Sequence, residues 1–334
     1  MTAAALSCMR EEKPPVILDD KGGDVATLRV SVLERDETKS PGEEDIATLQ
    51  IMVFDGNGIM EASLYADDWD GEEEMTVTSG AKRICLVANY PEMEGINTYG
   101  DLERVVFTFQ ECSPEANGGF LMTSEISTEL RPGRNRLEAT LRRRVSKICL
   151  SPIDLSGMNP ALRGKISFRA AFLTNVRKSV SFGGQTAPDV SEFCYKVGCD
   201  SLGRAIDALG GAFRPAWGTF GCLSLKDLAK EGGSLYCFPN NLDGSVEDYS
   251  GTVPESFTPS RTKLVVQAVT SSGKVWYYPL RLPAPLLDNH TYTINLSVSG
   301  PGSDHPDIIP EYGSYSARLS VNPWVHGATY TENL

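Results

Sequence analysis

Histidines, cysteines and clustered carboxylates are the residues best able to do chemistry, and their spacing in this 334-residue sequence supports no catalytic or metal site. There are three histidines, and none stands at ligand spacing from another histidine or from a cysteine. A zinc centre or a Ser-His-Asp site is therefore not predicted. A hydrolase would need a carboxylate pair across a cleft, and the sequence identifies none. We expect no enzyme, no cofactor and no metal; the histidines are His290, His305 and His326.

Two charged clusters could be binding sites, but each has a simpler structural interpretation. Residues 67–74 read DDWDGEEE and resemble a calcium loop, but they lack the alternating ligand positions and the distal glutamate of an EF-hand. We interpret them as a solvated acidic loop. Residues 142–144 are three consecutive arginines that could bind anions. In an acidic protein, a basic cluster beside a domain junction more often pairs with carboxylates.

The eight cysteines fit neither a metal site nor a complete disulfide framework. They are scattered, no CxxC pair occurs, and setting Cys8 aside leaves an odd number. Most are expected to be buried thiols that act as small apolar residues. One bridge remains open, either Cys194–Cys199 or Cys222–Cys237. The other cysteines are Cys85, Cys112 and Cys149.

A group of aromatic residues lies among the glycine-rich loops of residues 211–260. Such rings could form a ligand platform on the surface. They could also form a local core beneath the loops, which we favour. The residues are Trp217, Phe220, Tyr236 and Phe238.

Composition favours a soluble all-β protein. Hydrophobic residues make up 41% and charged residues 22%, while 31 glycines and 20 prolines separate short apolar runs. The net charge of −13 at pH 7 argues against nucleic acid, because phosphate binding needs a basic face. No apolar stretch reaches the length of a membrane span.

The first half of the chain reads as strands with polar connections. Residues 26–33 alternate, with Leu28, Val30 and Val32 on one face, as in a half-buried strand. A polar loop covers 34–44, and a strand over 46–54 ends in the hairpin signal DGNG. Further elements are strands over 82–88, 136–141 and 145–150 and a short helix over 99–106.

The pattern restarts near residue 151, and this predicts two tandem antiparallel β-sandwich domains, 24–148 and 149–334. The second should contain a strand over 166–173, a hairpin of 264–269 with 275–280, and alternating strands over 291–298 and 315–321. Residues 199–209 have apolar side chains at helical spacing, which predicts a short helical insertion in this domain.

The N-terminus reads MTAAALSC before the chain turns charged. Small and apolar residues that run into a cysteine resemble the end of a lipoprotein signal, which predicts lipidation of Cys8 and export. Residues 1–23 would then be a signal remnant and tether, with the true start upstream of Met1. The alternative is an ordinary terminus with a chance cysteine.

Several segments, in this order, resemble the fimbrillins, the major fimbrial subunits of Bacteroidetes (FimA- and Mfa-like pilins). No single piece is diagnostic, but their order from residue 26 to residue 324 makes the match specific, whereas 185–260 matches poorly. The segments are Ala26–Val32, Ala47–Gly56, Gly119–Glu125, Arg143–Ile148, Val275–Leu280, Asn289–Tyr292, Leu296–Pro306 and the final Pro323-Trp324.

The resemblance implies two transthyretin-like domains. It also implies that the protein is made as an outer-membrane lipoprotein precursor and then becomes part of a cell-surface fimbria. In the family, a trypsin-like protease cuts after the first strand, and the groove left behind accepts a strand from a neighbouring subunit. Arg35 sits where the family has its cleavage arginine, with Lys39 as the fallback. Glu34 and Asp36 flank Arg35 with negative charge, which departs from the family pattern, so Arg35 could also be a plain solvated residue.

The same resemblance assigns two strand roles. Leu28, Val30 and Val32 would plug the groove before cleavage. Residues 314–334 would donate the strand to a neighbour, although they could also form an ordinary final core strand. The donor candidates are Tyr315, Ala317, Leu319, Val321 and Trp324.

We therefore expect a structural fimbrial subunit that polymerises by protease-triggered donor-strand exchange and supports adhesion. Its partners would be other copies or related subunits, the maturation protease and a host or bacterial surface receptor, with the membrane reached only through the lipid. Two alternatives stay open. One is a fimbrial anchor or tip protein of the same family, and the other is a carbohydrate-binding surface lipoprotein that uses the 211–260 loops.

Overall fold

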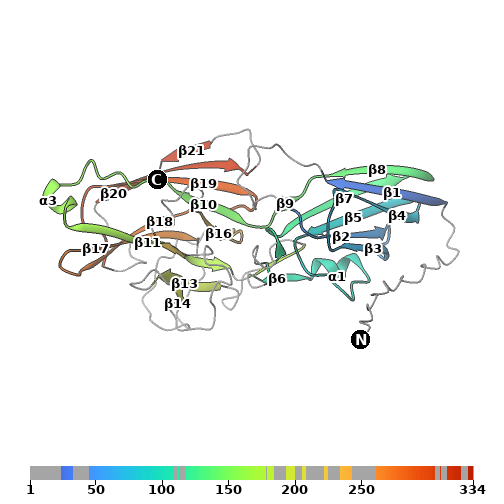
Figure 1. The fold of residues 1–334 in the computed structure, drawn as a ribbon, viewed down its shortest axis with the longest axis horizontal. Helices are drawn as coiled ribbons and strands as arrows, with labels where there is room; N and C mark the ends of the chain where they lie inside the picture. The colour runs from blue at the N-terminus through green and yellow to red at the C-terminus, as the bar shows by residue number, and fades with distance from the viewer. Residues whose placement is uncertain are drawn as a thin grey trace, which may run out of the picture.

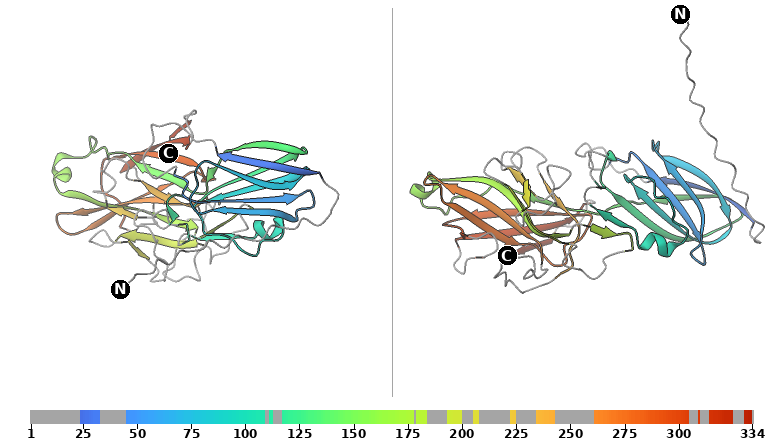
Figure 2. Two further views of the ribbon diagram at one scale, coloured as in Figure 1. Left: turned by 45° about the vertical axis from the view of Figure 1, so that its right-hand side comes forward. Right: turned by 90° about the horizontal axis from the view of Figure 1, so that it is seen from below.

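The protein is seen here as a computed structural model in which two β-sandwich domains lie one after the other along the long axis (Figures 1 and 2). The all-β class predicted from the sequence is confirmed, since strands dominate and the helices are short. In the part of the chain that the structure describes, no helix is long and apolar enough to cross a membrane. The described residues are 24–32, 45–108, 111–112, 117–177, 179–183, 193–199, 205–207, 222–224, 234–242, 261–304, 309, 314–324 and 330–333.

The first domain consists of a three-stranded sheet, in the order β4-β1-β8, that faces a five-stranded sheet, in the order β3-β2-β5-β7-β9. The DGNG signal forms the turn between β2 and β3 as predicted. The strands are β1 (Val25–Val32), β2 (Leu49–Asp55), β3 (Met60–Ala66), β4 (Glu72–Thr78), β5 (Gly80–Ala88), β7 (Met122–Leu130), β8 (Gly133–Ala139) and β9 (Arg142–Arg143).

The five-stranded sheet is buried on both faces. Ile51 and Val53 of β2 join the core between the two sheets, while Met52 and Phe54 point to the opposite side. That side is covered by α1 (Tyr99–Glu103) and β6 (Val106–Thr108), where the ring of Tyr99 meets Phe54 edge-on with centroids 5.9 Å apart. A capping box between Thr98 and Asp101 starts the helix. The helix predicted over 99–106 is thus present but shorter.

The second domain also has two sheets. One has the order β16-β10-β19-β20-β21, and the other has the order β14-β13-β11-β17-β18 with β15 paired to β11. The predicted hairpin is present as β17 and β18. The elements are β10 (Ser146–Leu150), α3 (Pro160–Arg163), β11 (Ile166–Arg177), β12 (Ser179–Ser181), β13 (Phe193–Cys199), β14 (Ala205–Asp207), β15 (Cys222–Ser224), β16 (Leu235–Cys237), β17 (Lys263–Thr270), β18 (Val275–Arg281), β19 (His290–Val298), β20 (Tyr315–Pro323) and β21 (Tyr330–Asn333).

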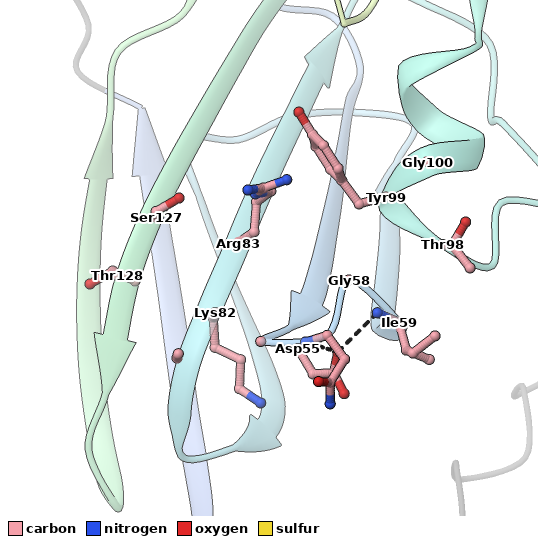
Figure 3. A pocket seen from close by; sticks show the side chains of 13 residues that line it. Asp55, Gly58, Ile59, Lys82, Arg83, Thr98, Tyr99, Gly100, Ser127 and Thr128 are labelled. Carbon is pink, nitrogen blue, oxygen red and sulfur yellow. Dashed lines mark hydrogen bonds between the residues drawn. The ribbon is translucent and has the colours of Figure 1, made fainter.

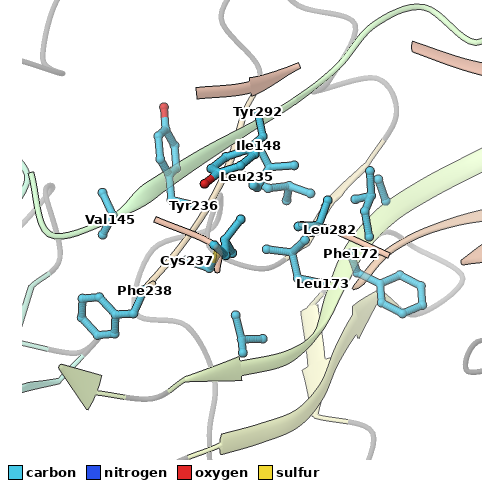
Figure 4. Packing of buried hydrophobic residues seen from close by; sticks show 14 of the residues in the cluster. Val145, Ile148, Phe172, Leu173, Leu235, Tyr236, Cys237, Phe238, Leu282 and Tyr292 are labelled. Atoms are coloured by element: carbon cyan, nitrogen blue, oxygen red, sulfur yellow. The ribbon is translucent and has the colours of Figure 1, made fainter. Parts of the chain in front are cut away.

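The core of the second domain lies between these sheets and continues toward the first domain. Figure 4 shows side chains of β10, β11 and β16 meeting there, among them Ile148, Leu173 and Leu235, all fully buried. Phe238 and Val145 lie at the end of this cluster. Leu102 and Phe120 of the first domain belong to the same buried cluster. A continuous apolar core therefore joins the two sandwiches.

The chain changes sheets between Arg143 of β9 and Ser146 of β10. A second connection is the pairing of β6, from the first domain, with β12, from the second. The boundary predicted at residues 148–149 stays a prediction, and the change of strand partners lies slightly before it.

The helical insertion predicted over 199–209 is wrong for the described residues. Cys199 ends β13, and Ala205–Asp207 form β14, which pairs antiparallel with β13. Gly198 and Gly203 weaken a helix, and a short apolar run cannot by itself distinguish helix from strand. Residues 205–207 form a strand because they can make hydrogen bonds with the edge of β13.

Candidate functional site

The candidate site is the place that β1 occupies in the first domain. Of β1, residues Val25–Ser31 pair antiparallel with β4, and Ala26–Val32 pair parallel with β8. In Figure 1, β1 lies between these two strands. A strand with neighbours on both sides satisfies the backbone groups of both. Without β1, the facing edges of β4 and β8 would each expose a row of unpaired N–H and C=O groups.

The inward face of β1 completes the core. Ala26, Leu28 and Val30 are fully buried and Val32 nearly so. They pack with side chains of β2 and β5, including Ile51 and Leu86. Burying each of the larger side chains contributes about 1.5–3 kcal/mol. The space that β1 fills, bounded by β4, β8 and this core face, is called the β1 groove below.

The outward face of β1 carries charge. The Nε of Arg29 lies 2.7 Å from a carboxylate oxygen of Glu72 and 3.6 Å from one of Glu74, both on β4. On the other side, Arg136 of β8 is level with Arg29 in the register and is itself 3.7 Å from Glu138. The side chain of Arg29 is 52% exposed, so solvent screens these contacts. The groove therefore has an acidic rim on β4 and a largely basic one on β8.

The three groove-plug residues predicted from the sequence, Leu28, Val30 and Val32, thus share the buried face of one strand. The predicted lipidation and cleavage residues, Cys8, Arg35 and Lys39, lie outside the described residues.

The predicted donor residues lie in β20 and just after it. Ala317 and Leu319 are buried in the second domain, and β20 pairs with β19 along its whole length. Its other side pairs with β21 over Arg318–Val321. The hydroxyl of Tyr315 donates to the carbonyl of Pro279 at 2.7 Å. In this structure the segment is therefore a central strand of its own domain, which agrees with the alternative of a core strand.

Trp324, the last donor candidate, lies at the joint between the domains. Its ring stacks on Tyr236 with centroids 5.9 Å apart and meets Phe120 of the first domain at the same distance. The guanidinium of Arg143 sits 4.7 Å from the ring centroid on another side. The backbone N–H of Trp324 donates to the carbonyl of Asn289 at 2.8 Å. Trp324 thus fastens the end of β20 to both domains.

Two of the four proposed platform aromatics are core residues. Phe238 is fully buried and Tyr236 nearly so, within the cluster that joins the domains. Neither offers a free ring face to a ligand, so the local-core interpretation holds for both. Trp217 and Phe220 lie outside the described residues.

The arginine triplet has carboxylate partners, as predicted. Arg142 and Arg144 both approach the carboxylate of Asp288, at 3.7 Å and 3.6 Å. Arg143 is buried, and its Nη1 donates to the side-chain oxygen of Asn289 at 3.5 Å. The three side chains hold β9 to the turn before β19.

Most of the described cysteines are buried thiols. Cys85, Cys112 and Cys237 are buried and unbridged, and Cys149 is unbridged and half-buried. The proposed Cys222–Cys237 bridge is therefore wrong, because Cys237 is a free thiol inside the second-domain core. The side chains of Cys194 and Cys199 lie outside the described part of the structure. Among the described residues, no group of three or more histidine, cysteine, aspartate or glutamate side chains could hold a metal ion.

The sequence did not indicate an open cavity of about 680 Å³ on the first domain (Figure 3). It lies between the β2–β3 turn, the start of α1 and the outer face of β5 and β7. Arg83 covers one face of the Tyr99 ring at 3.9 Å and pairs with Glu125. Slight burial acts to raise the pKa of Asp55, but N–H donors from Ile59 and Asn57 lower it. Ligand sites are usually lined mainly by apolar and aromatic surface, whereas this open cavity is lined equally by polar and apolar atoms.

Solved structures of other proteins share this two-domain β-sandwich fold. A candidate cell adhesion protein from Parabacteroides distasonis is 17% identical, with a TM-score of 0.65, and the match covers 91% of this chain and 100% of that one. Fimbrilin (FimA) from Porphyromonas gingivalis is 16% identical, with a TM-score of 0.62 and coverage of 91% and 98%. A second candidate cell adhesion protein, from Bacteroides eggerthii, is 19% identical, with a TM-score of 0.64 and coverage of 92% and 98%.

The sequence comparison places the first domain more specifically. Residues 26–138 match the family described as major fimbrial subunit protein (FimA). This span begins in β1 and ends in β8, so it contains the whole β1 groove. No curated protein matches the chain. The resemblance to the fimbrillins predicted from the sequence is thus confirmed, by the family match over residues 26–138 and by the fold of both domains. The description of the matched family is that of a structural subunit.

Proposed function

We propose that the protein is a structural subunit of a cell-surface fimbria and that it polymerises by exchanging the strand in its β1 groove. The observation that carries the proposal is the position of β1, which completes the core of the first domain although residues 33–44 separate it from the rest of that domain in sequence. A cut in this segment would separate β1 covalently from the sheet that it completes. The match of residues 26–138 to a major fimbrial subunit family supports the proposal.

The energetics favour replacement of β1 over an empty groove. Loss of β1 would leave an apolar trough and two open strand edges. An extended segment from another subunit would restore main-chain hydrogen bonds on both sides and would place alternate side chains into the trough. The proposed protease site is Arg35, with Lys39 as the fallback.

The proposed donor is the C-terminal stretch 314–334, now held in the second domain. Tyr315, Ala317, Leu319 and Val321 have the alternation that the groove requires, and Trp324 would mark the end of β20. Before assembly the segment is stored as β20 and β21, and assembly would move it to a neighbouring subunit. Ala317 and Leu319 would exchange one buried environment for another.

The cell-surface setting follows from the family of fimbrial subunits, and we propose that Cys8 carries the lipid of an outer-membrane precursor. The partners would be further copies of the chain or related subunits. A trypsin-like maturation protease and a surface receptor complete the proposed set, with adhesion as the role of the assembled fibre.

An anchor or tip protein of the same family is the second candidate, because related fold neighbours include a tip fimbrial protein, Mfa3 from Porphyromonas gingivalis, with a TM-score of 0.51. An anchor would keep β1 and its lipid, and a tip would accept a strand without donating one. Carbohydrate binding by the 211–260 loops gains no support from Tyr236 or Phe238, which are core residues.

The test is limited digestion of the purified full chain with a trypsin-like protease. N-terminal sequencing should find a new start after Arg35 or Lys39, and gels without boiling should then show a ladder of oligomers. The variant Arg35→Gln/Lys39→Gln, treated in the same way, should stay whole and monomeric. A wild-type chain that is cut there, releases β1 and remains monomeric would contradict assembly by strand exchange.

A further inference from the structure

The strand that fills the groove and the strand proposed to replace it have the same pattern of residue types. Residues 26–32 read ATLRVSV, and residues 315–321 read YSARLSV. Aligned without a gap, the inward positions of both are apolar or aromatic. The outward positions carry threonine or serine, then arginine, then serine. Arg318 of β20 thus corresponds to Arg29 of β1, at the centre of each segment.

The groove holds the central arginine with two carboxylates. Arg29 lies between Glu72 and Glu74, at 2.7 Å and 3.6 Å. The next acidic residue, Glu73, is level with Val30 and is only partly buried at the core margin. Arg136 on β8 faces Arg29 from the other side, but Glu138 partly compensates its charge at 3.7 Å. A positive charge at this point of the groove is therefore favoured.

Where it is stored, Arg318 has no such partner in the part of the chain that the structure describes. It is exposed on β20, level with Asn295 of β19 and Asn333 of β21. Among the described residues it makes no ion pair, whereas the structure supplies two carboxylates to Arg29. Transfer of the segment from β20 to the groove would give Arg318 the contacts that it lacks.

We propose that Glu72 and Glu74 select the strand that enters the β1 groove by recognising an arginine at its centre, and that residues 315–321 of a second copy of this chain meet this requirement through Arg318. The inference rests on the proposed function, since it concerns the strand that replaces β1. In this arrangement Tyr315, Ala317, Leu319 and Val321 take the places of Ala26, Leu28, Val30 and Val32, which also fixes the register.

The acidic rim explains how an open groove could avoid wrong strands. An unpaired edge attracts any extended segment, and charged residues along it are a common protection. In a chain whose net charge is −13, Glu72 and Glu74 repel acidic strands and offer a neutral strand no ion pair. A central arginine converts this repulsion into attraction, which gives selectivity by charge.

The experiment uses the full chain after cleavage with a trypsin-like protease and fluorescent peptides of residues 312–324. Arg318→Gln and Ser316→Glu peptides each lower the peptide charge by one, but Ser316 takes the place of Thr27, whose neighbours are Thr76 and Arg134. The Arg318→Gln peptide should bind about two- to fivefold more weakly than wild type. The Ser316→Glu peptide should bind as tightly as wild type or more tightly.

Exchanging the charges of the groove and of the peptide should restore the preference. The Glu72→Lys/Glu74→Lys chain should prefer an Arg318→Glu peptide over the wild-type peptide. Equal binding of the Arg318→Gln and Ser316→Glu peptides to the wild-type chain would overturn this inference alone. If the cleaved chain has lost β1 and binds none of the peptides, the proposed strand exchange fails as well.

A second measurement needs no cleavage. In the intact chain, Arg29→Gln should lower the denaturant midpoint of the first domain, and this shift should vanish in a Glu72→Gln/Glu74→Gln background. An identical shift in both backgrounds would show that the two carboxylates do not recognise the arginine, and would overturn the inference.

Discussion

The first strands of the two domains occupy equivalent places but are held in different ways. β1 runs parallel to β8 in the first domain, and β10 runs parallel to β19 in the second. Each also has an antiparallel neighbour, β4 or β16. Beyond β10 the chain stays bound to the same sheet, since the N–H groups of Ser151 and Asp154 donate to carbonyls of β19 at 2.9 Å and 2.8 Å.

The end where β10 begins is fastened as well. The Oγ of Ser146 donates to the carbonyl of Leu287 at 2.7 Å, and the N–H of Asn289 donates to the carbonyl of Val145 at 2.9 Å. Loss of β10 would therefore open the joint between the domains. Loss of β1 would open only the first sandwich. The same topology thus provides one strand that completes only its own sandwich and one strand that also fastens the two domains together.

The largest difference in stability between the two domains is expected from a substitution in a buried ion pair of the first domain. Lys82 Nζ lies 2.5 Å from a carboxylate oxygen of Glu61, and the two side chains are 3% and 12% exposed. Lys82→Met leaves the carboxylate of Glu61 buried without a positive charge beside it, although the N–H of Thr78 still donates to it, and should cost about 3–5 kcal/mol of unfolding free energy. Hydrogen exchange should show β2 and β5 opening more often while β19 is unchanged. The double variant Lys82→Met/Glu61→Leu should recover most of the loss.

A pair of truncations compares the two first strands directly. Leu28 of β1 and Ile148 of β10 are both fully buried, and cutting either to alanine should cost about 2–5 kcal/mol. Leu28→Ala should weaken protection in the first domain alone, whereas Ile148→Ala should weaken the second domain and the joint. Val25→Ala serves as the control, because Val25 is 61% exposed. Uniform loss of protection in both domains after Leu28→Ala would contradict the independence of the β1 sheet.

Alkaline pH should destabilise both domains, because each buries a cysteine thiol whose pKa is raised by burial, Cys85 in the first and Cys237 in the second. Burial raises the pKa of the Cys85 thiol to about 12, from an ordinary value near 9. Burial likewise raises the pKa values of Tyr278 and Tyr292 to about 12, from 10. A raised folded-state pKa gives stability that is complete below the unfolded-state value and is lost as the pH rises toward the folded-state value. Each group should therefore cost about 1.4 kcal/mol per pH unit in this window.

Denaturant midpoints measured from pH 8 to pH 11 can check this loss. Both domains should begin to lose stability near pH 9, and Cys85→Ala should make the loss in the first domain less steep. The same substitution should leave the pH profile of the second domain unchanged. An unaltered first-domain profile in Cys85→Ala would show that another group controls it.

The smallest effect is expected at the two matching arginines. Arg29→Gln removes an exposed ion pair and should cost no more than about 1 kcal/mol. Arg318→Gln removes a side chain without an ion pair among the described residues, so its effect should stay within about 0.5 kcal/mol. Denaturant unfolding of the two variants in parallel measures the difference. A larger loss from Arg318→Gln would mean that its place in β20 is more important to the intact chain than the contacts indicate.

Local patterns predicted several strands, because those strands carry their own evidence. The patterns missed β3 and β7, and the loop predicted over 67–74 is wrong at its end, because Glu72–Glu74 begin β4 and pair with β1. The alternation of Leu28, Val30 and Val32 marked the buried face of β1, and the DGNG turn fixed the register of β2 with β3. The helical spacing over 199–209 failed because pairing with β13, a non-local interaction, outweighed a weak local preference.

Contacts between distant segments could not be predicted in this way. The parallel pairing of β1 with β8 joins residues about a hundred positions apart, and the local sequence of neither segment indicates it. The stacking of Trp324 on Tyr236 and the meeting of Arg29 with Glu72 depend equally on the finished fold. Only the resemblance to a known family linked the ends of the chain to one groove, because it carries information about long-range packing that a single sequence does not show.

The orientation of β1 has a mechanical consequence. The hydrogen bonds of β1 to β4 lie across the strand direction, so a pull along the strand loads many of them at once, whereas peeling from one end would break them one after another. The parallel ladder to β8 shares the same load from the other side. A strand seated in this groove, whichever molecule it comes from, should therefore resist lengthwise tension much better than sideways tearing.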